Sequence, residues 1–198
     1  MSIRRIWLFA ALLLSMSGTS GCQVLAPPAE SKTTWRVNEP NGTAILGDFS
    51  RPQITQVCMD DGFRRGARVL ADRSRSYEVA PGNCIDVEAS TLELSVPCAR
   101  DCSRQPLGSG TVASVDGVRP PRGAWTLDGG GSREVAHLIN PRFYEICNAG
   151  QLLVRLYSEY RITDRDVRQD ACGAVRGRDI GVQSPPGNAS SGAYRYVE

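Results

Sequence analysis

The sequence predicts an all-β protein made of two small modules in tandem, each a sandwich or barrel closed by disulfides. From residue 23 onward, no segment has the long apolar stripe of an amphipathic helix. Apolar and polar residues alternate instead with a period of two, most clearly over residues 152–162, which is typical of a half-buried strand. Short segments rich in Gly, Pro and Asn separate these stretches and indicate turns. The pattern therefore favours many short strands over helices.

An internal repeat divides the chain into the two modules, with residues 35–94 matching residues 125–182. In both copies a tryptophan precedes a cysteine by 22 or 23 positions, and a second cysteine follows 25 or 26 positions later. A proline lies six positions before the first cysteine in each copy. This spacing indicates a duplication; the alternative is two unrelated β segments with coincidental cysteines. The matched pairs are Trp35 and Trp125, Pro52 and Pro141, Cys58 and Cys147, and Cys84 and Cys172.

The composition fits one domain or two small ones and excludes a disordered chain. The chain has 198 residues, of which 41% are hydrophobic, enough to bury a core. No apolar run is long enough for a multi-span membrane protein. The net charge of +2 falls to zero once the first 21 residues are removed, because they contain Arg4 and Arg5 and no acidic residue. A neutral chain does not predict a nucleic-acid-binding protein.

The N-terminus has the three parts of a secretory signal. Residues 1–5 are positively charged, residues 6–16 are apolar except for Ser15, and small residues follow up to Gly21. The end of this segment, Thr19-Ser20-Gly21-Cys22, resembles the lipobox of bacterial lipoprotein precursors. The resemblance implies cleavage before Cys22, a diacylglycerol thioether on that cysteine and an acylated N-terminus. It also implies a place at the outer membrane facing the periplasm, because Gln23 and not an aspartate follows the cysteine.

The rival interpretation of the N-terminus is ordinary secretion, with cleavage between Gly18 and Ser20 and a free thiol at Cys22. The cysteine count favours the lipoprotein, because a lipidated Cys22 leaves an even number of cysteines in an oxidising compartment. Equivalent cysteines of the repeat are then expected to form equivalent disulfides. A closed loop of about 26 residues would stabilise each module by roughly 3–4 kcal/mol. The predicted pairs are Cys58–Cys84, Cys147–Cys172 and, by remainder, Cys98–Cys102.

These features divide the chain into six segments. The C-terminal segment is predicted as a flexible tail, and its alternating end, residues 193–198, has the alternative of adding a strand to a sheet. The two tryptophans are expected in the cores, with a binding groove as the alternative. The segments are a signal peptide over 1–21, the lipidated cysteine and tether over 22–34, the first β module over 35–96, a connecting loop over 97–124, the second β module over 125–183 and the tail over 184–198.

Residues typical of catalysis or metal binding are few. His137 is the only histidine, and no Gly-x-Ser-x-Gly motif is present. The repeat aligns His137 near Leu46, which favours a structural role. Cys98 and Cys102 offer only two metal ligands and are expected as a disulfide in an oxidising compartment. We therefore predict no catalytic residue, no metal and no cofactor.

Two kinds of charged cluster remain as candidate sites. The acidic pairs Asp60–Asp61 and Asp164 with Asp166 are expected in turns as solvated residues, with acid–base catalysis or calcium binding as the alternative. The basic cluster is interpreted either as a site for lipid phosphates, envelope polyanions or an acidic partner, or as an exposed face. Its members are Arg64, Arg65, Arg68, Arg73 and Arg75.

The sequence therefore predicts a non-enzymatic binding or assembly protein, anchored to a membrane through lipid on Cys22. An adaptor, an accessory subunit or an inhibitor with a protein partner in the cell envelope fits these features, and its oligomeric state stays open. The alternative is an envelope hydrolase that uses carboxylates, for instance on glycans.

Overall fold

The structure is a computed structural model that describes residues 32–98, 102, 106–115, 122–159 and 161–197. The signal segment, Cys22 and most of the predicted tether lie outside the described residues. Within the described part every regular element is a strand, which confirms the all-β prediction. That part contains no helix of the length and hydrophobicity needed to cross a membrane.

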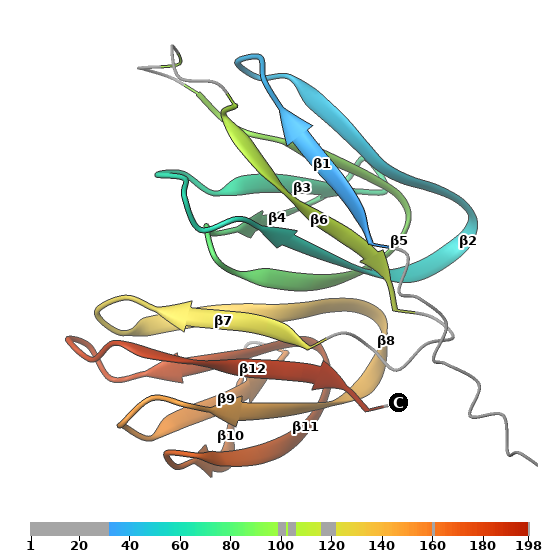
Figure 1. The fold of residues 1–198 in the computed structure, drawn as a ribbon. Helices are drawn as coiled ribbons and strands as arrows, with labels where there is room; N and C mark the ends of the chain where they lie inside the picture. The colour runs from blue at the N-terminus through green and yellow to red at the C-terminus, as the bar shows by residue number, and fades with distance from the viewer. Residues whose placement is uncertain (1–31, 99–101, 103–105, 116–121, 160, 198) are drawn as a thin grey trace, which may run out of the picture.

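The first module contains six strands that pair antiparallel in the order β1-β6-β2-β5-β3-β4. The long strands β2 and β5 curve, so that the module closes on itself (Figure 1). Its strands are β1 (Thr33–Val37), β2 (Thr43–Met59), β3 (Ala67–Ala71), β4 (Arg75–Val79), β5 (Cys84–Ser95) and β6 (Gly108–Ser114).

The second module repeats this arrangement, with the antiparallel order β7-β12-β8-β11-β9-β10. Each strand of the first module therefore has a counterpart with the same neighbours. This agreement supports the duplication, which stays a prediction from the sequence. The strands are β7 (Gly123–Leu127), β8 (Gly131–Asn148), β9 (Val154–Ser158), β10 (Arg161–Val167), β11 (Ala171–Ser184) and β12 (Ser190–Tyr196).

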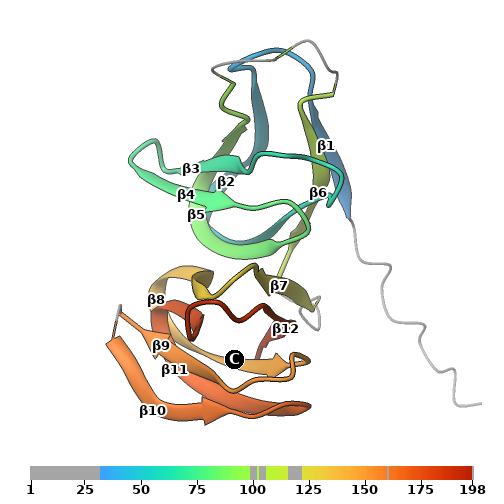
Figure 2. The same ribbon diagram turned by 90° about the vertical axis from the view of Figure 1, so that its left-hand side faces the viewer.

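The two modules meet where β5 of the first lies beside β8 of the second, an arrangement visible from both directions (Figures 1 and 2). Here the chain forms one short parallel pairing, Asp86 with Ala136 and Val87 with His137. Each module also has its own cluster of buried apolar residues. Trp35 and Trp125 are buried in these clusters, at 5% and 0% exposure, and so occupy the cores.

The described cysteines form three disulfides with the pairing predicted from the repeat. Cys58–Cys84 joins directly opposed residues of β2 and β5, and Cys147–Cys172 does the same between β8 and β11. Cys98–Cys102 closes a local loop. The long disulfides therefore link the central strand pair of each module.

The structure corrects the predicted boundaries at two strands. β6 lies inside the predicted connecting loop 97–124, where it pairs with β1 and β2. β12 lies inside the predicted flexible tail 184–198, where it pairs with β7 and β8. Both strands are rich in Gly, Ser and Ala, so their own sequence has little strand propensity, and neighbouring strands on both sides determine their conformation.

The alternation over residues 152–162 also belongs to two strands and not to one. β9 ends at Ser158, Glu159 takes a positive φ of 46°, and β10 begins at Arg161. The period of two continues through this hairpin, because both strands present an alternating pattern.

Candidate ligand groove between the modules

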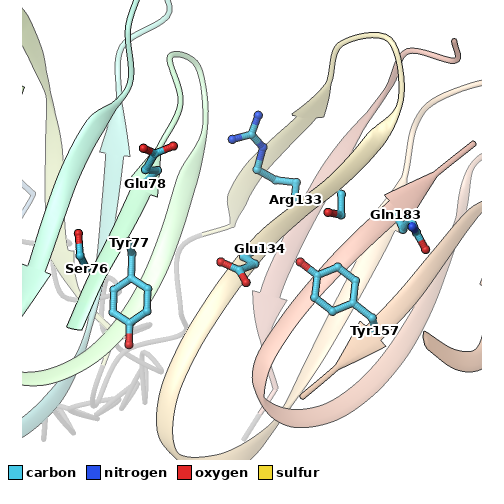
Figure 3. A pocket seen from close by; sticks show the side chains of 8 residues that line it. Ser76, Tyr77, Glu78, Arg133, Glu134, Tyr157 and Gln183 are labelled. Carbon is cyan, nitrogen blue, oxygen red and sulfur yellow. The ribbon is translucent and has the colours of Figure 1, made fainter. Parts of the chain in front are cut away.

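The clearest candidate site is a groove of about 590 Å³ between the two modules. Figure 3 shows Tyr77 and Glu78 on one side of it and Arg133 and Glu134 on the other. Side chains from four strands line it, so it exists only when both modules are in place. They are Ser76, Tyr77 and Glu78 of β4, Ser132, Arg133 and Glu134 of β8, Tyr157 of β9 and Gln183 of β11.

The first wall of the groove is the edge of β4. This strand pairs with β3 alone. Its three lining residues are consecutive, and consecutive side chains of a strand point to opposite faces. The groove therefore runs along the strand edge, where backbone and side chains of both faces border it.

The β3–β4 turn holds that edge in position. Asp72 and Arg73 take positive φ angles of 49° and 55°, as in tight hairpins. The Asp72 carboxylate accepts hydrogen bonds from the backbone N–H groups of Ser90 (2.8 Å) and Thr91 (3.1 Å) and from Arg75 Nη2 (2.8 Å). Partial burial acts to raise the pKa of Asp72, but these hydrogen bonds outweigh it and lower the pKa. The turn is thereby attached to β5 through a charged side chain.

The second wall belongs to the second module, where Ser132, Glu134 and Gln183 share one sheet face and Arg133 lies on the opposite face of β8. Ser132 lies opposite Gln183, and Gly181 lies between Glu134 and Tyr157. A side chain at position 181 would not fit, because a Cβ there would lie 2.2 Å from Tyr157 Cζ. The glycine thus leaves room for the tyrosine ring to lie flat beside the groove.

His137 supports both walls from behind. The ring is 1% exposed, its Nδ1 lies 3.0 Å from Asp179 Oδ1, and the Tyr77 ring stacks on it at 3.8 Å. Its Nε2 lies 2.9 Å from Glu134 Oε2. Interaction with this ring lowers the pKa of Glu134 against the opposing effect of partial burial. His137 therefore positions a tyrosine from one module and a carboxylate from the other.

Three further polar contacts fix the modules relative to each other. Asp86 of β5 is fully buried and accepts hydrogen bonds from Tyr144 Oη (3.0 Å), Tyr194 Oη (3.1 Å) and Gln56 Nε2 (3.2 Å). Burial raises the pKa of Asp86 to about 6, although these hydrogen bonds oppose the shift.

The other two contacts flank Asp86. Glu88 Oε2 accepts a hydrogen bond from the backbone N–H of Ile139 at 2.8 Å. The Asn83 side chain accepts from the Thr126 N–H at 2.7 Å and donates to the Thr126 hydroxyl at 2.9 Å. Because buried polar groups are costly unless they are paired, these contacts favour one relative position of the modules.

The structure does not bring the predicted arginine cluster together in one patch. Arg64 and Arg65 lie between β2 and β3, beside a separate cavity of about 260 Å³. Arg73 and Arg75 lie at the opposite end of the β3–β4 hairpin, and Arg75 also donates to the Glu88 carbonyl at 3.0 Å. Arg68 is exposed on β3, opposite Glu78.

The acidic pairs lie away from the groove. Asp60 is exposed and accepts a hydrogen bond from Ser109 Oγ at 2.5 Å. Asp61 is also exposed, and Asp166 lies 3.8 Å from Arg155. Of the side chain of Asp164 the structure describes nothing.

Among the described residues, one group of side chains has the spacing of metal ligands. Glu145, Cys147 and Cys172 have their polar atoms within 4.8 Å of one another. The two sulfurs are joined in a disulfide, however, so they are not thiolate ligands. This group therefore does not form a metal site.

Sequence reasoning missed Asp86, Glu88 and Tyr77. The alternation over residues 84–88 is typical of a strand in which Asp86 and Glu88 belong to the polar set. Both are buried because the second module covers that face. Their signal was two acids in an otherwise apolar strand, but the sequence alone does not show what covers them.

Comparisons with known proteins give little further information. No protein-family model matches the chain, and no curated protein is similar to it. Among solved structures, YhaK from Escherichia coli is 9% identical with a TM-score of 0.29, covering 83% of this chain and 82% of that one. A regulatory subunit of a cAMP-independent protein kinase A from Trypanosoma cruzi, bound to guanosine, is 8% identical with a TM-score of 0.25, covering 85% and 72%.

A third similar structure is A223, a turret protein of Sulfolobus turreted icosahedral virus. It is 10% identical with a TM-score of 0.24, and the match covers 85% of this chain and 98% of that one. Likenesses of this size carry no argument about function.

Proposed function

We propose that the protein is a lipid-anchored binding protein of the cell envelope, an adaptor that holds another envelope component close to a membrane. The observation that carries this proposal is the groove between the modules, whose walls come from both halves of the chain. Polar contacts across the interface hold those walls in place, so little conformational freedom is lost when a ligand binds.

The anchor rests on the resemblance of residues 19–22 to a lipobox. Acyl chains stabilise membrane association by about 0.8 kcal/mol for each buried CH₂ group, and two or more chains anchor a protein stably. The three disulfides agree with an oxidising compartment. The ten residues between Cys22 and β1, residues 23–32, would reach at most about 36 Å, so the groove would stay near the membrane surface.

A photo-cross-linking amino acid at Ser132 tests the proposal in intact cells. Ser132 is exposed and lines the groove, whereas Ser50 on β2 is exposed and lines none of the described cavities. We expect a discrete cross-linked product from position 132 and none from position 50.

The same experiment with Cys22→Ser tests the anchor. The variant should appear in the soluble fraction, and its cross-linked product should be reduced severalfold. Equal products from positions 132 and 50 would contradict the groove as the recognition site, and membrane retention of Cys22→Ser would contradict lipid anchoring.

A further inference from the structure

We infer that the groove binds a short, uncharged glycan. The inference rests on the proposed function and names the class of ligand that its site takes. All eight side chains that line the groove carry a polar group. Two are serine hydroxyls, two are tyrosines, two are carboxyls, and the others are the amide of Gln183 and the guanidinium of Arg133.

This lining matches the chemistry of a sugar. Each sugar hydroxyl both donates and accepts a hydrogen bond, so it needs acceptors such as Glu78 and Glu134 beside donors such as Arg133 and Gln183. The C–H face of a pyranose ring packs on an aromatic ring, which the half-buried Tyr77 supplies, whereas Tyr157 is buried at 7% exposure. The groove thus combines the polar and the aromatic contacts that a hydroxyl-rich ligand requires.

The same lining disfavours the other common classes of ligand. Sites for apolar small molecules are lined mainly by hydrophobic side chains. A peptide added to the β4 edge would gain specificity from pockets for its alternate side chains. Among the described residues no aliphatic side chain lines this groove, so apolar side chains of a peptide would find no apolar pocket there, and a saccharide fits better.

The charge of the groove lining restricts which glycans can bind. The lining contains two carboxyl groups, Glu78 and Glu134, and one guanidinium, Arg133. The interaction with the His137 ring lowers the pKa of Glu134. A polyanionic sugar would meet net negative charge in the groove, whereas a neutral or N-acetylated sugar would not.

The binding groups are already held in place. Tyr77 stacks on the buried His137 ring, and the same ring lies beside Glu134. Pre-oriented side chains of this kind reduce the entropy lost on binding.

Isothermal titration calorimetry on the purified, detergent-solubilised lipoprotein tests the inference with two probes. The first is the β-1,4-linked tetramer of N-acetylglucosamine, and the second is tetragalacturonate, an α-1,4-linked polyanionic tetrasaccharide. We expect the first probe to bind with one site per chain and the second to bind at least about tenfold more weakly, a difference of about 1.4 kcal/mol.

Variants then locate the binding. Ser132→Trp should abolish it by filling the groove, and Ser50→Trp should leave it unchanged. Glu78→Gln should weaken it about tenfold, because a charge-assisted hydrogen bond is replaced by a neutral one. Far-UV circular dichroism of each variant checks that the fold is retained.

Two outcomes would overturn the inference: no binding of the neutral tetramer, or binding that survives Ser132→Trp. A protein cross-linked at position 132 in cells, together with no saccharide binding, would refute the glycan and leave the adaptor function standing. Cleavage of the tetramer during the titration would refute the adaptor function and leave the glycan site standing.

Discussion

Asp86 is a buried ionisable residue that joins the two modules. It lies on β5 of the first module and accepts hydrogen bonds from Tyr144 and Tyr194 of the second. Burial of the carboxylate raises its pKa from 3.8 to about 6, and the buried tyrosines beside it have pKa values well above 10. The folded protein therefore binds a proton at Asp86 more tightly than the unfolded chain does.

This raised pKa predicts that the charged Asp86 carboxylate lowers the free energy of unfolding at neutral pH. Asp86→Asn should remove this pH-dependent loss of stability. Because the folded pKa is raised, the stabilising effect is fully present below the unfolded pKa of 3.8 and is lost as the pH rises through about 6. The shift corresponds to about 3 kcal/mol of unfolding free energy. Asn resembles the neutral acid and does not titrate, so the variant should gain about 2–3 kcal/mol relative to the wild type between about pH 4 and about pH 7.

Urea unfolding of both proteins at the two pH values measures this difference. The lowered pKa of Glu134 acts in the opposite sense, since its contribution is lost as the pH falls. It is present in both proteins and cancels in the comparison. A stability difference that does not change with pH would contradict the role of Asp86.

The sequence reveals such residues only in part. It placed Asp86 in a strand correctly, because alternation is a local property of the chain. It does not show that the side chain is buried, because burial there depends on β8, about 50 residues further along the chain. For the same reason the groove could not be predicted: its walls lie on strands that the sequence does not show to be neighbours.

At the scale of elements, the last strand of each module packs against the tryptophan of that module's first strand. These pairs are β6 with β1 and β12 with β7. Trp35 lies opposite Gly110, and Trp125 lies opposite Gly192. A Cβ at either glycine would lie 2.0 Å from a cysteine carbonyl oxygen and within 2.8 Å of the tryptophan ring. Both modules thus require a glycine at the same structural position.

Gly192→Ala should therefore destabilise the protein by about 2–3 kcal/mol, because the added methyl group overpacks the core between β12 and β7. Gly62→Ala is the matched control, since nothing lies within 4 Å of a Cβ at that position, and its effect should stay within about 0.5 kcal/mol. Urea unfolding monitored by tryptophan fluorescence gives both values. Equal stability of the two variants would show that β12 does not pack tightly against Trp125.

These strands also explain which elements the sequence predicted. The spacing of Trp, Pro and Cys predicted two modules and the disulfide pairs, because a repeated pattern is visible without knowledge of the fold. β6 and β12 were not predicted as strands, because their residues, Gly108–Ser114 and Ser190–Tyr196, contain few apolar side chains. Their glycines, which lower strand propensity, are the residues that allow close packing beneath the tryptophans.

At the scale of the whole molecule, the two modules share buried polar groups as well as a chain. Asp86, Glu88 and Asn83 of the first module all bond to residues of the second. If one module unfolded, the other would lose these hydrogen bonds, each of which contributes about 0.5–1.5 kcal/mol net, together with the packing between the modules. The summed loss is comparable with the stability of a small domain, so we expect unfolding of one module to destabilise the other.

We therefore predict that the modules unfold as one cooperative unit, and removal of one disulfide tests this. The double variant Cys147→Ala, Cys172→Ala releases a loop of 25 residues in the second module and should cost roughly 3–4 kcal/mol. Native-state hydrogen exchange should then speed up in the cores of both modules by similar factors, because both exchange through the same global opening.

The variant Cys98→Ala, Cys102→Ala is the control for loss of a disulfide as such, because its loop has a sequence separation of only four. Its smaller loop should give a smaller increase in exchange, again shared by both modules. If the Cys147 and Cys172 variant accelerated exchange in β7–β12 and left β1–β6 protected, the modules would be separately stable domains. In that case the polar contacts across the interface would orient the modules without coupling their stabilities, and the groove would open and close with the angle between them.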